Sequence, residues 1–213
     1  MHNKNVIFKI AQAINYSGND FKIGVLVSGG GSNLQSLIDF SKTPAAHYKV
    51  AAVISNASDN IALERAQKAG IPHRRIHHKD FAKKEDFEVE MIHFLEQEEV
   101  HLIVLAGFLR VLSSTFVNYF YNRIINLHPS LLPKFPGLHA IRQALEAKES
   151  VSGCTVHLVD QGLDTGEIIA QSSCPIEPSD SRDKLDQKIH RLEHQLLPRI
   201  VNEIAQTTRS QLS

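Results

Sequence analysis

Three apolar runs in the first half of the chain do not alternate with polar residues, and no other feature constrains the fold as strongly. They are IGVLV (23–27), VAAVI (50–54) and LIVLA (102–106), with stretches of helical spacing between them. A strand that is apolar on both faces is buried on both faces, which is typical of a parallel sheet between two helix layers. We therefore predict the α/β class, with an open, mostly parallel twisted sheet and helices on both faces.

The part of the chain after residue 150 has a different pattern. Two extended segments, TVHLV (155–159) and EIIAQ (167–171), flank a turn rich in Asp and Gly, and they predict antiparallel strands. Apolar residues at helical spacing between Leu185 and Ile200 predict a long final helix. Residues 1–20 have one weakly amphipathic stretch. We predict that they are an N-terminal appendage of unknown role and that residues 21–213 form one catalytic domain.

The charge balance and the cysteines argue against several classes of protein. The 23 basic and 23 acidic side chains leave no overall field that would favour a nucleic acid or an anionic membrane as partner. Two cysteines without a CxxC pair, and a His73, His77, His78 cluster without a partner at a known spacing, predict no metal site. The chain also lacks a secretory-signal pattern and any apolar stretch of membrane-spanning length, so we expect a cytoplasmic protein.

The first motif with chemical meaning is SGGGSN (28–33), between a buried strand and a helix. Glycines there free backbone N–H groups, which form an anion cradle together with the helix N-terminus. Leu34 stands where the dinucleotide fingerprint has its third glycine, and no Gly-Lys-Ser/Thr follows. The motif therefore favours a phosphomonoester over NAD or ATP. The alternative is a tight strand-to-helix turn in which Ser32 or Asn33 caps the helix.

The second motif is IINLHPSLLPKFPG (124–137), at the carboxyl end of a short buried strand, where open parallel sheets bind their ligands. Asn126 and His128 are two residues apart on this strand and face the same side. An amide donor beside an imidazole suits a tetrahedral acyl-transfer intermediate, because the donors hold the oxyanion and the imidazole takes part in proton movement. Three prolines stiffen the loop that follows. A hydrogen-bonded pair without a catalytic role is the alternative.

The third motif is LDTG (163–166), which places Asp164 on the turn between the two antiparallel segments. An aspartate in a turn usually hydrogen-bonds its own backbone. If it lies near His128, its carboxylate can hold an imidazolium, orient a water and accept a proton. His157, which alternates with apolar residues, faces the same site or has a purely structural partner, and the sequence favours neither.

Four segments, VLVSGGGSNLQ, AGFLRVLS, INLHPSLLPKFPG and HLVDQGLDTGEII, closely resemble the phosphoribosylglycinamide formyltransferase family, the folate-dependent step of purine synthesis. The resemblance runs from about Lys22 to about Pro198. It implies a Rossmann-like formyltransferase domain over residues 21–213. It also implies an enzyme that transfers the formyl group of 10-formyltetrahydrofolate to the amine of glycinamide ribonucleotide. Its partners would be these small molecules, and the protein would be a monomer or a homodimer.

The resemblance further implies roles for individual residues. The catalytic trio would be Asn126, His128 and Asp164. The phosphate and the glycinamide end of the substrate would be held by Gly31, Ser32, Asn33 and Glu193. The folate would lie along the backbone of Leu109, Arg110, Val111 and Leu112, with further contacts from Asn126 and Lys84. Some members of the family have arginine at the position of Lys84.

By the same resemblance, the glycinamide amine attacks the formyl carbon directly, Asn126 and His128 hold the tetrahedral intermediate, and Asp164 assists proton transfer through water. Methionyl-tRNA formyltransferase and formyltetrahydrofolate deformylase have a similar domain and are alternatives. The first usually adds a tRNA-binding domain and the second a regulatory domain, and we expect neither in 213 residues. A non-catalytic protein that binds a phosphate ligand is an alternative of another class, but it would have no use for the trio.

Overall fold

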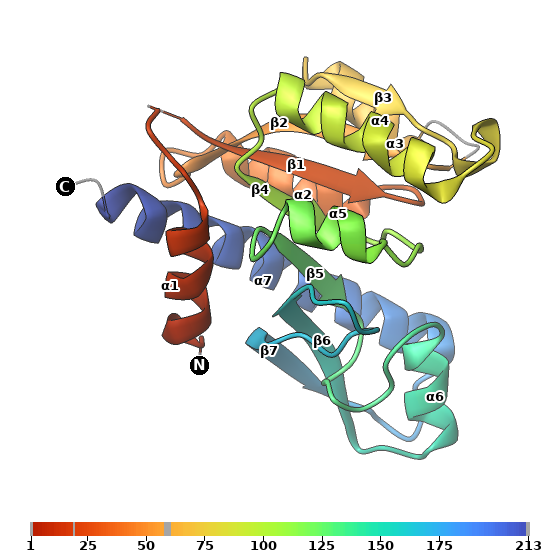
Figure 1. Ribbon diagram of the computed structural model, residues 1–213. Helices are drawn as coiled ribbons and strands as arrows, with labels where there is room; N and C mark the ends of the chain where they lie inside the picture. Colours follow the sequence, from red (N-terminus) through yellow and green to blue (C-terminus); the bar gives the residue numbers. More distant parts are fainter. Residues whose placement is uncertain (1, 19, 58–60, 212–213) are drawn as a thin grey trace.

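The computed structural model describes residues 2–18, 20–57 and 61–211. Over these residues the chain forms one sheet of seven strands in the order β3-β2-β1-β4-β5-β6-β7 (Figure 1). The strands are β1 (Phe21–Val27), β2 (Tyr48–Ser55), β3 (His73–Arg75), β4 (Leu102–Leu105), β5 (Ile124–His128), β6 (Val151–Leu158) and β7 (Ile168–Pro175). Strands β1 to β5 run parallel, whereas β6 is antiparallel to β5 and β7 is antiparallel to β6. The predicted sheet, mostly parallel with antiparallel strands near its C-terminal part, is confirmed.

Helices cover both faces of the sheet (Figure 1). The helical elements are α1 (Lys4–Ala13), α2 (Ser32–Ser41), α3 (Ile61–Lys68), η1 (His78–Asp80), α4 (Lys84–Gln97), α5 (Ser114–Tyr119), α6 (Ala140–Glu146) and α7 (Arg182–Ser210). Helices α2, α3 and α7 share one apolar core with the sheet, and α4 and α5 share another. The helix layers on both faces that the sequence predicts are thus present.

The unbroken apolar runs follow from these two cores. On β1, Val25 and Val27 lie in the core beneath α2 and α7, while Leu26 between them lies in the core beneath α4. On β4, Val104 lies in the core beneath α2 and α7, and Ile103 lies in the core beneath α4. Successive side chains of a strand point to opposite faces, so a strand between two helix layers has no solvent face for a polar residue.

The order of the strands places a crevice between β1 and β4. The chain continues from β1 to β2 and β3 on one side, and from β4 to β5 on the other side. Open parallel sheets bind ligands at such a switch point, outside the carboxyl ends of the strands. The glycine loop (residues 28–33) follows β1 at this edge, and segment 107–113 follows β4. The fold therefore brings two of the sequence motifs to one place.

The N-terminal residues pack onto the rest of the chain. The side chains of Val6, Ile7 and Ile10 on α1 are buried in the core that contains α7, and Figure 1 shows α1 beside the C-terminal part of α7. The backbone N–H of Asn3 donates to the carbonyl of Ile169 on β7 over 2.8 Å. The division into an appendage (1–20) and a catalytic domain (21–213) stays a prediction, although α1 shares the core of the main fold.

Among the described residues, no helix combines the length and the apolar character that a membrane crossing requires.

Candidate active site

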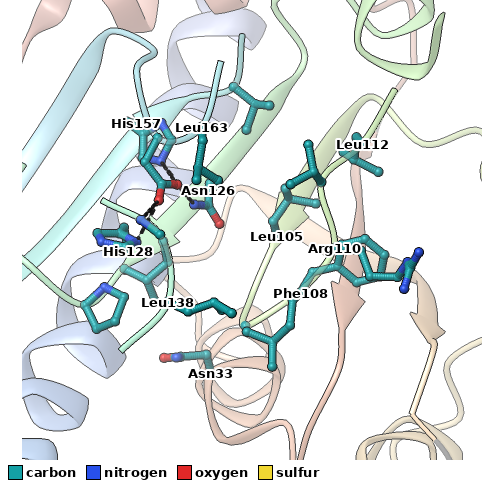
Figure 2. Close-up of a pocket in the computed structure, with 18 of the residues that line it drawn as sticks. Asn33, Leu105, Phe108, Arg110, Leu112, Asn126, His128, Leu138, His157 and Leu163 are labelled. Atoms are coloured by element: carbon teal, nitrogen blue, oxygen red, sulfur yellow. Dashed lines mark hydrogen bonds and ion pairs between the residues drawn. The ribbon is translucent and has the colours of Figure 1, made fainter. Parts of the chain in front are cut away.

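A cavity of about 490 Å³ opens at the carboxyl edge of the sheet. Its walls come from the glycine loop, segment 107–113, the end of β5, the loop before α6, the β6–β7 loop and one face of α7. In Figure 2, Asn126, His128 and His157 lie on the left, Phe108, Arg110 and Leu112 lie on the right, and Asn33 lies below them. Polar side chains gather at one end of a mostly apolar cavity, as is usual for small-molecule sites.

Four polar side chains at that end form the β5–β6 cluster: Asn126, His128, His157 and Asp164. Asn126 and His128 lie two residues apart on β5 and face the same side, and His157 stands opposite Asn126 in the antiparallel register with β6. Asp164 reaches in from the β6–β7 loop, with side-chain atoms within 3.5 Å of each of the other three. The structure thus brings the predicted trio together and adds His157 to it.

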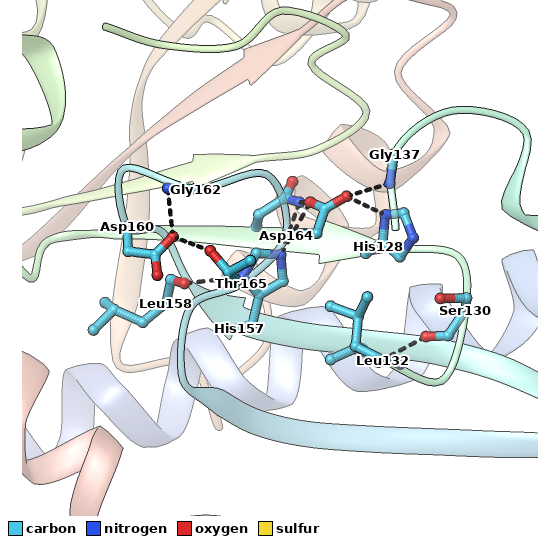
Figure 3. Close-up of polar contacts among 12 residues, drawn as sticks. His128, Ser130, Leu132, Gly137, His157, Leu158, Asp160, Gly162, Asp164 and Thr165 are labelled. Carbon is cyan, nitrogen blue, oxygen red and sulfur yellow. Dashed lines mark hydrogen bonds and ion pairs between the residues drawn. The ribbon is translucent and has the colours of Figure 1, made fainter. Parts of the chain in front are cut away.

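Asp164 is an acceptor for the site and not for its own turn (Figure 3). Its Oδ2 accepts from the backbone N–H of Gly137 over 2.8 Å, and its Oδ1 accepts from Nδ2 of Asn126 over 3.2 Å. Asp160 forms the hydrogen bonds within the turn, because its Oδ1 accepts from the N–H of Gly162 and from the hydroxyl of Thr165. Asp164 has a φ of 54°, in the left-handed region that non-glycine residues rarely adopt. This backbone conformation directs the carboxylate of Asp164 towards the cluster, and it costs backbone strain.

The surroundings of Asp164 keep it ionised. Burial by itself raises the pKa of this carboxyl group, but the hydrogen bonds from His157 and Gly137 and the charges of the two neighbouring histidines outweigh burial and lower the pKa to about 2. Its side chain is only 10% exposed. At neutral pH a nearly buried negative charge thus lies beside two imidazole rings.

The hydrogen bonds of His128 determine where its protons lie. Its Nε2 is 2.8 Å from the carbonyl oxygen of Phe135, which can only accept, so Nε2 carries a hydrogen. Its Nδ1 is 3.3 Å from Oδ2 of Asp164. An attractive contact between Nδ1 and a carboxylate requires a second hydrogen. The carboxylate of Asp164 is therefore placed to support an imidazolium at His128 when the ring takes up a second proton.

The amide nitrogen of Asn126 faces two other members of the cluster. Nδ2 lies 3.2 Å from Asp164 and 3.0 Å from Nε2 of His157. Nδ1 of His157 lies 2.9 Å from the carbonyl of Leu158 and donates there, while its Nε2 faces both Nδ2 of Asn126 and, over 3.5 Å, Oδ1 of Asp164. Among the described residues, none donates to Oδ1 of Asn126, and Figure 2 shows this oxygen directed away from His157. Both N–H groups of the amide are thus directed at other members of the cluster, and its oxygen is the atom without a partner.

The glycine loop leads directly into α2, and Gly31 occupies the N-cap position with a φ of 71°. Neither Ser32 nor Asn33 caps the helix, so the alternative in which one of them does so is wrong. A Cβ on residue 31 would lie 3.0 Å from the Cβ of Ala62, and L side chains rarely adopt this backbone conformation, so glycine is required there. Backbone N–H groups at the start of α2 are thereby left without a side-chain partner.

Asn33 and Glu193 connect the glycine loop to α7. Nδ2 of Asn33 donates to Oε2 of Glu193 over 2.9 Å, and both residues line the cavity. Glu193 is buried, and burial raises its pKa against the opposing effects of the Asn33 hydrogen bond and the His190 charge. Gly31 and Ser32 do not line this cavity, although Ser32 faces a more open hollow beside it.

Segment 107–113 forms the opposite wall. Leu109, Arg110, Val111 and Leu112 all line the cavity, as the resemblance implies for the folate. Figure 2 shows the guanidinium of Arg110 pointing away from the β5–β6 cluster. Lys84 does not line the cavity; it lies at the start of α4 with its Nζ 3.8 Å from Oε1 of Glu88. The structure therefore places segment 107–113 at the cavity, whereas Lys84 lies outside the cavity lining.

Sequence reasoning missed several residues of the site. Gly137 stands in the proline-rich motif, but nothing in the motif shows that its N–H binds Asp164. Asp186 and His190 also line the cavity, and with Glu193 they have the i, i+4, i+7 spacing of one helix face. That spacing from Glu193 was the signal that could have identified them.

The histidines near β3 have no metal-binding arrangement. The rings of His77 and His78 lie with their centroids 4.7 Å apart and are tilted by 36°. Across the described parts of the chain, no group of three or more His, Cys, Asp or Glu side chains could hold a metal ion.

Comparison with known proteins places this site in a family. The formyl transferase family model matches residues 21–201. The chain is 42% identical to phosphoribosylglycinamide formyltransferase of Escherichia coli over 183 residues, which are 86% of each chain. It is 53% identical to the trifunctional purine biosynthetic protein adenosine-3 of Drosophila melanogaster over 180 residues, 84% of this chain but only 13% of the fly protein. The chain thus spans a small fraction of the length of such trifunctional relatives.

The structural comparison agrees with the sequence comparison. The fold matches glycinamide ribonucleotide transformylase 1 of Symbiobacterium toebii with a TM-score of 0.86 and 38% identity, covering 91% of both chains. It matches phosphoribosylglycinamide formyltransferase of Brucella melitensis with a TM-score of 0.83, covering 87% of this chain and 96% of the other. On the family model, the sequence identity and the fold together, this chain belongs to the phosphoribosylglycinamide formyltransferase family of formyl transferases.

Proposed function

We propose that this chain transfers the formyl group of 10-formyltetrahydrofolate to the amine of glycinamide ribonucleotide, a step of purine biosynthesis. The observation that carries the proposal is the β5–β6 cluster, in which Asn126, His128 and Asp164 meet at one end of the cavity. A protein that only bound a phosphate ligand would have no use for a nearly buried, ionised carboxylate beside two imidazoles. The names of the relatives support formyl transfer to the same ribonucleotide acceptor.

In the proposed mechanism the amine of the substrate attacks the formyl carbon and the carbonyl oxygen becomes an oxyanion. The imidazolium of His128 stabilises that charge, and the amide of Asn126 does so when one of its N–H groups leaves Asp164 or His157 for the oxyanion. The C–N bond to the folate then breaks. One proton leaves the attacking nitrogen and one reaches the folate nitrogen, so the reaction as a whole consumes none. Asp164 assists this transfer through a water molecule.

The glycine loop, α7 and segment 107–113 bind the two substrates. Gly31, Ser32 and Asn33 hold the phosphate at the uncapped start of α2, where free N–H groups and the helix dipole favour an anion. Glu193 meets the glycinamide end. The folate lies along the backbone of Leu109, Arg110, Val111 and Leu112, close to Asn126. A contact between the folate and Lys84 stays a prediction, and it requires the ligand to extend beyond the cavity lining.

Further features of the proposal are a cytoplasmic location, a monomer or homodimer, no metal, and no nucleic-acid or membrane partner. A zero formal net charge supports the last point, because the chain has no overall basic field. The alternatives within the family, methionyl-tRNA formyltransferase and formyltetrahydrofolate deformylase, differ from the proposal in the acceptor of the formyl group.

One assay compares these possibilities. The purified chain is incubated with 10-formyltetrahydrofolate and either glycinamide ribonucleotide, charged initiator tRNA, or no acceptor, and the release of tetrahydrofolate is measured. We expect turnover with glycinamide ribonucleotide alone. Turnover with tRNA at a rate similar to that with glycinamide ribonucleotide would favour a methionyl-tRNA formyltransferase. Turnover without an acceptor at such a rate would favour a formyltetrahydrofolate deformylase. Binding of glycinamide ribonucleotide without turnover would support a binding protein.

A further inference from the structure

Segment 107–113 has no regular secondary structure and little internal support. Between β4 and α5, the backbone N–H and C=O groups of Arg110, Val111 and Leu112 form no hydrogen bond with any described residue. Leu109 and Val111 are exposed, at 68% and 61%, so side-chain burial does not hold these two residues in place. Free backbone groups recognise a ligand only if the chain that carries them is held in one conformation. The contacts that fix this segment therefore decide how well it binds.

The first point of attachment is Ser28, the first residue of the glycine loop. Its backbone N–H donates to the carbonyl of Gly107 over 3.0 Å. Its hydroxyl oxygen accepts from the N–H of Leu109 over 2.8 Å and donates to Oδ1 of Asn56 over 2.6 Å. Asn56 thus orients the Ser28 hydroxyl so that its lone pair is available to Leu109. Ser28 fixes the start of the segment to the loop after β1.

The second point of attachment is Glu88, a glutamate on α4 that is only 2% exposed. Its Oε1 accepts from the backbone N–H of Ser113 over 2.8 Å, and its Oε2 accepts from the Ser113 hydroxyl. The same hydroxyl oxygen accepts from the N–H of Phe116 and caps α5. A buried carboxylate requires such partners, and here they are the residue that ends the segment and Lys84, 3.8 Å away.

We propose that Ser28 and Glu88 are positioning residues that hold segment 107–113 at its two ends and keep the backbone groups of residues 110–112 aligned for the ligand. Neither side chain lines the cavity, so each acts through the segment. The identity of the ligand as a reduced folate rests on the proposed function, whereas the two attachments do not. Lys84 contributes by balancing the charge of Glu88.

The two attachments contact different parts of the site. Glu88 contacts only the folate side of the cavity, through Ser113. Ser28 belongs to the glycine loop and contacts the folate side through Leu109, so it joins the two proposed substrate sites. Loss of Glu88 should therefore weaken folate binding alone, while loss of the Ser28 hydroxyl should disturb both sites.

The test compares Glu88→Gln with Glu90→Gln. Glutamine has nearly the volume of glutamate but replaces one acceptor oxygen by an NH2 donor, so it cannot reproduce the arrangement in which one oxygen accepts from the N–H and the other from the hydroxyl of Ser113. Glu90 lies on the same helix, pairs with Arg74 over 2.5 Å and has no contact with the segment, which makes it the matched control. Calorimetric titration measures the Kd of tetrahydrofolate and, separately, of glycinamide ribonucleotide. We expect Glu88→Gln to raise the tetrahydrofolate Kd about tenfold and the other Kd less than about twofold.

Ser28→Ala and hydrogen exchange complete the test. Ser28→Ala should raise both Kd values, and in the free protein the amide of Leu109 in Ser28→Ala and the amide of Ser113 in Glu88→Gln should exchange faster than in Glu90→Gln, because each loses its hydrogen-bond acceptor or has it weakened. A Glu88→Gln protein with the wild-type tetrahydrofolate Kd and unchanged exchange overturns the inference. If the wild type itself binds no tetrahydrofolate, the proposed function fails, and the exchange rates alone decide whether Glu88 holds the segment. A lowered Tm with both Kd values raised equally in Glu88→Gln would also overturn it, because that result reports a general loss of structure.

Discussion

The β5–β6 cluster and segment 107–113 face each other across one cavity but are built from different parts of the chain. The cluster consists of side chains that stand on β5 and β6 or on the β6–β7 loop, and its histidines are almost completely buried. Each of its members has two or more polar partners. The segment presents free backbone groups between exposed apolar side chains.

The difference indicates how the two regions contribute to the reaction. Charges that must stabilise a transition state are useful when they are preorganised and shielded from water, which the strands provide. A flat ligand that must enter and leave is better bound by a backbone edge, whose donors do not depend on the side chains. Substitutions in the cluster should therefore lower kcat, and substitutions in the segment should raise the KM of the folate alone.

The largest effect is expected for His128→Ala. This change removes the proposed imidazolium and leaves Asp164 without its closest charged partner. We expect kcat to fall on the order of a thousandfold, while the KM values of both substrates stay within about tenfold because uniform binding is retained. Steady-state kinetics on the folded variant measure this. A kcat near that of the wild type would end the catalytic assignment of the cluster.

Asp164→Asn should have the next largest effect. Asparagine has nearly the same size and keeps one acceptor, so the change removes mainly the charge that supports the imidazolium. We expect kcat to fall about a hundredfold and its pH profile to change shape, since the lost group belongs to a coupled pair. A folded variant with an unchanged rate and profile would reduce Asp164 to a turn residue.

The same variant has an expected dependence of stability on pH. A carboxyl group whose pKa is lowered to about 2 on folding contributes stability above its unfolded pKa of about 3.9, and this contribution disappears as the pH falls through the folded value. The difference in Tm between wild type and Asp164→Asn should thus be constant above about pH 5 and shrink between about pH 4 and 2. Thermal melts over this range measure it. A Tm difference that persists at pH 2 would assign the effect to packing and not to charge.

The fold was predictable because its main features are local patterns. Unbroken apolar runs require two buried faces, and the sheet has them; the pair at 155–159 and 167–171 is antiparallel, as β6 and β7. The packing of α1 was not predictable, because a weakly amphipathic stretch does not show which surface it covers. Only in the structure does Ile10 lie in the core with α7.

The candidate site was predictable in its members but not in its contacts. The spacing of Asn126 and His128 on one strand fixes their common face, whereas the meeting with Asp164 depends on a loop whose path no local pattern gives. His157 stayed undecided because its partner across the strands depends on the register. The N-cap at Gly31 was missed since serine and asparagine are the usual caps, and here the backbone conformation favours glycine.

Gly31→Val tests the glycine loop beside the cavity and should have a smaller effect than the two cluster variants. The side chain would be strained at a φ of 71° and would press against Ala62, so the loop must shift. We expect the KM of glycinamide ribonucleotide to rise at least about tenfold and the KM of the folate to stay constant. Inorganic phosphate should compete with the ribonucleotide in the wild type. Competition of phosphate with the folate alone would show that the glycine loop binds the other ligand.

The smallest effect is expected for Val111→Ala in segment 107–113, and the same position offers its own matched control. Val111 is 61% exposed and its backbone N–H has no partner among the described residues, so alanine removes only part of an apolar contact and keeps the donor. The KM of the folate should rise less than about threefold, because about two methyl groups of contact are lost. Val111→Pro removes the N–H itself, and if the backbone is the binding group, the KM should rise by a further factor of about ten with kcat little changed. Kinetics with both variants separate the two contributions. Equal losses in Val111→Ala and Val111→Pro would mean that the side chain and not the backbone binds the ligand, and the contrast between the segment and the cluster would no longer hold.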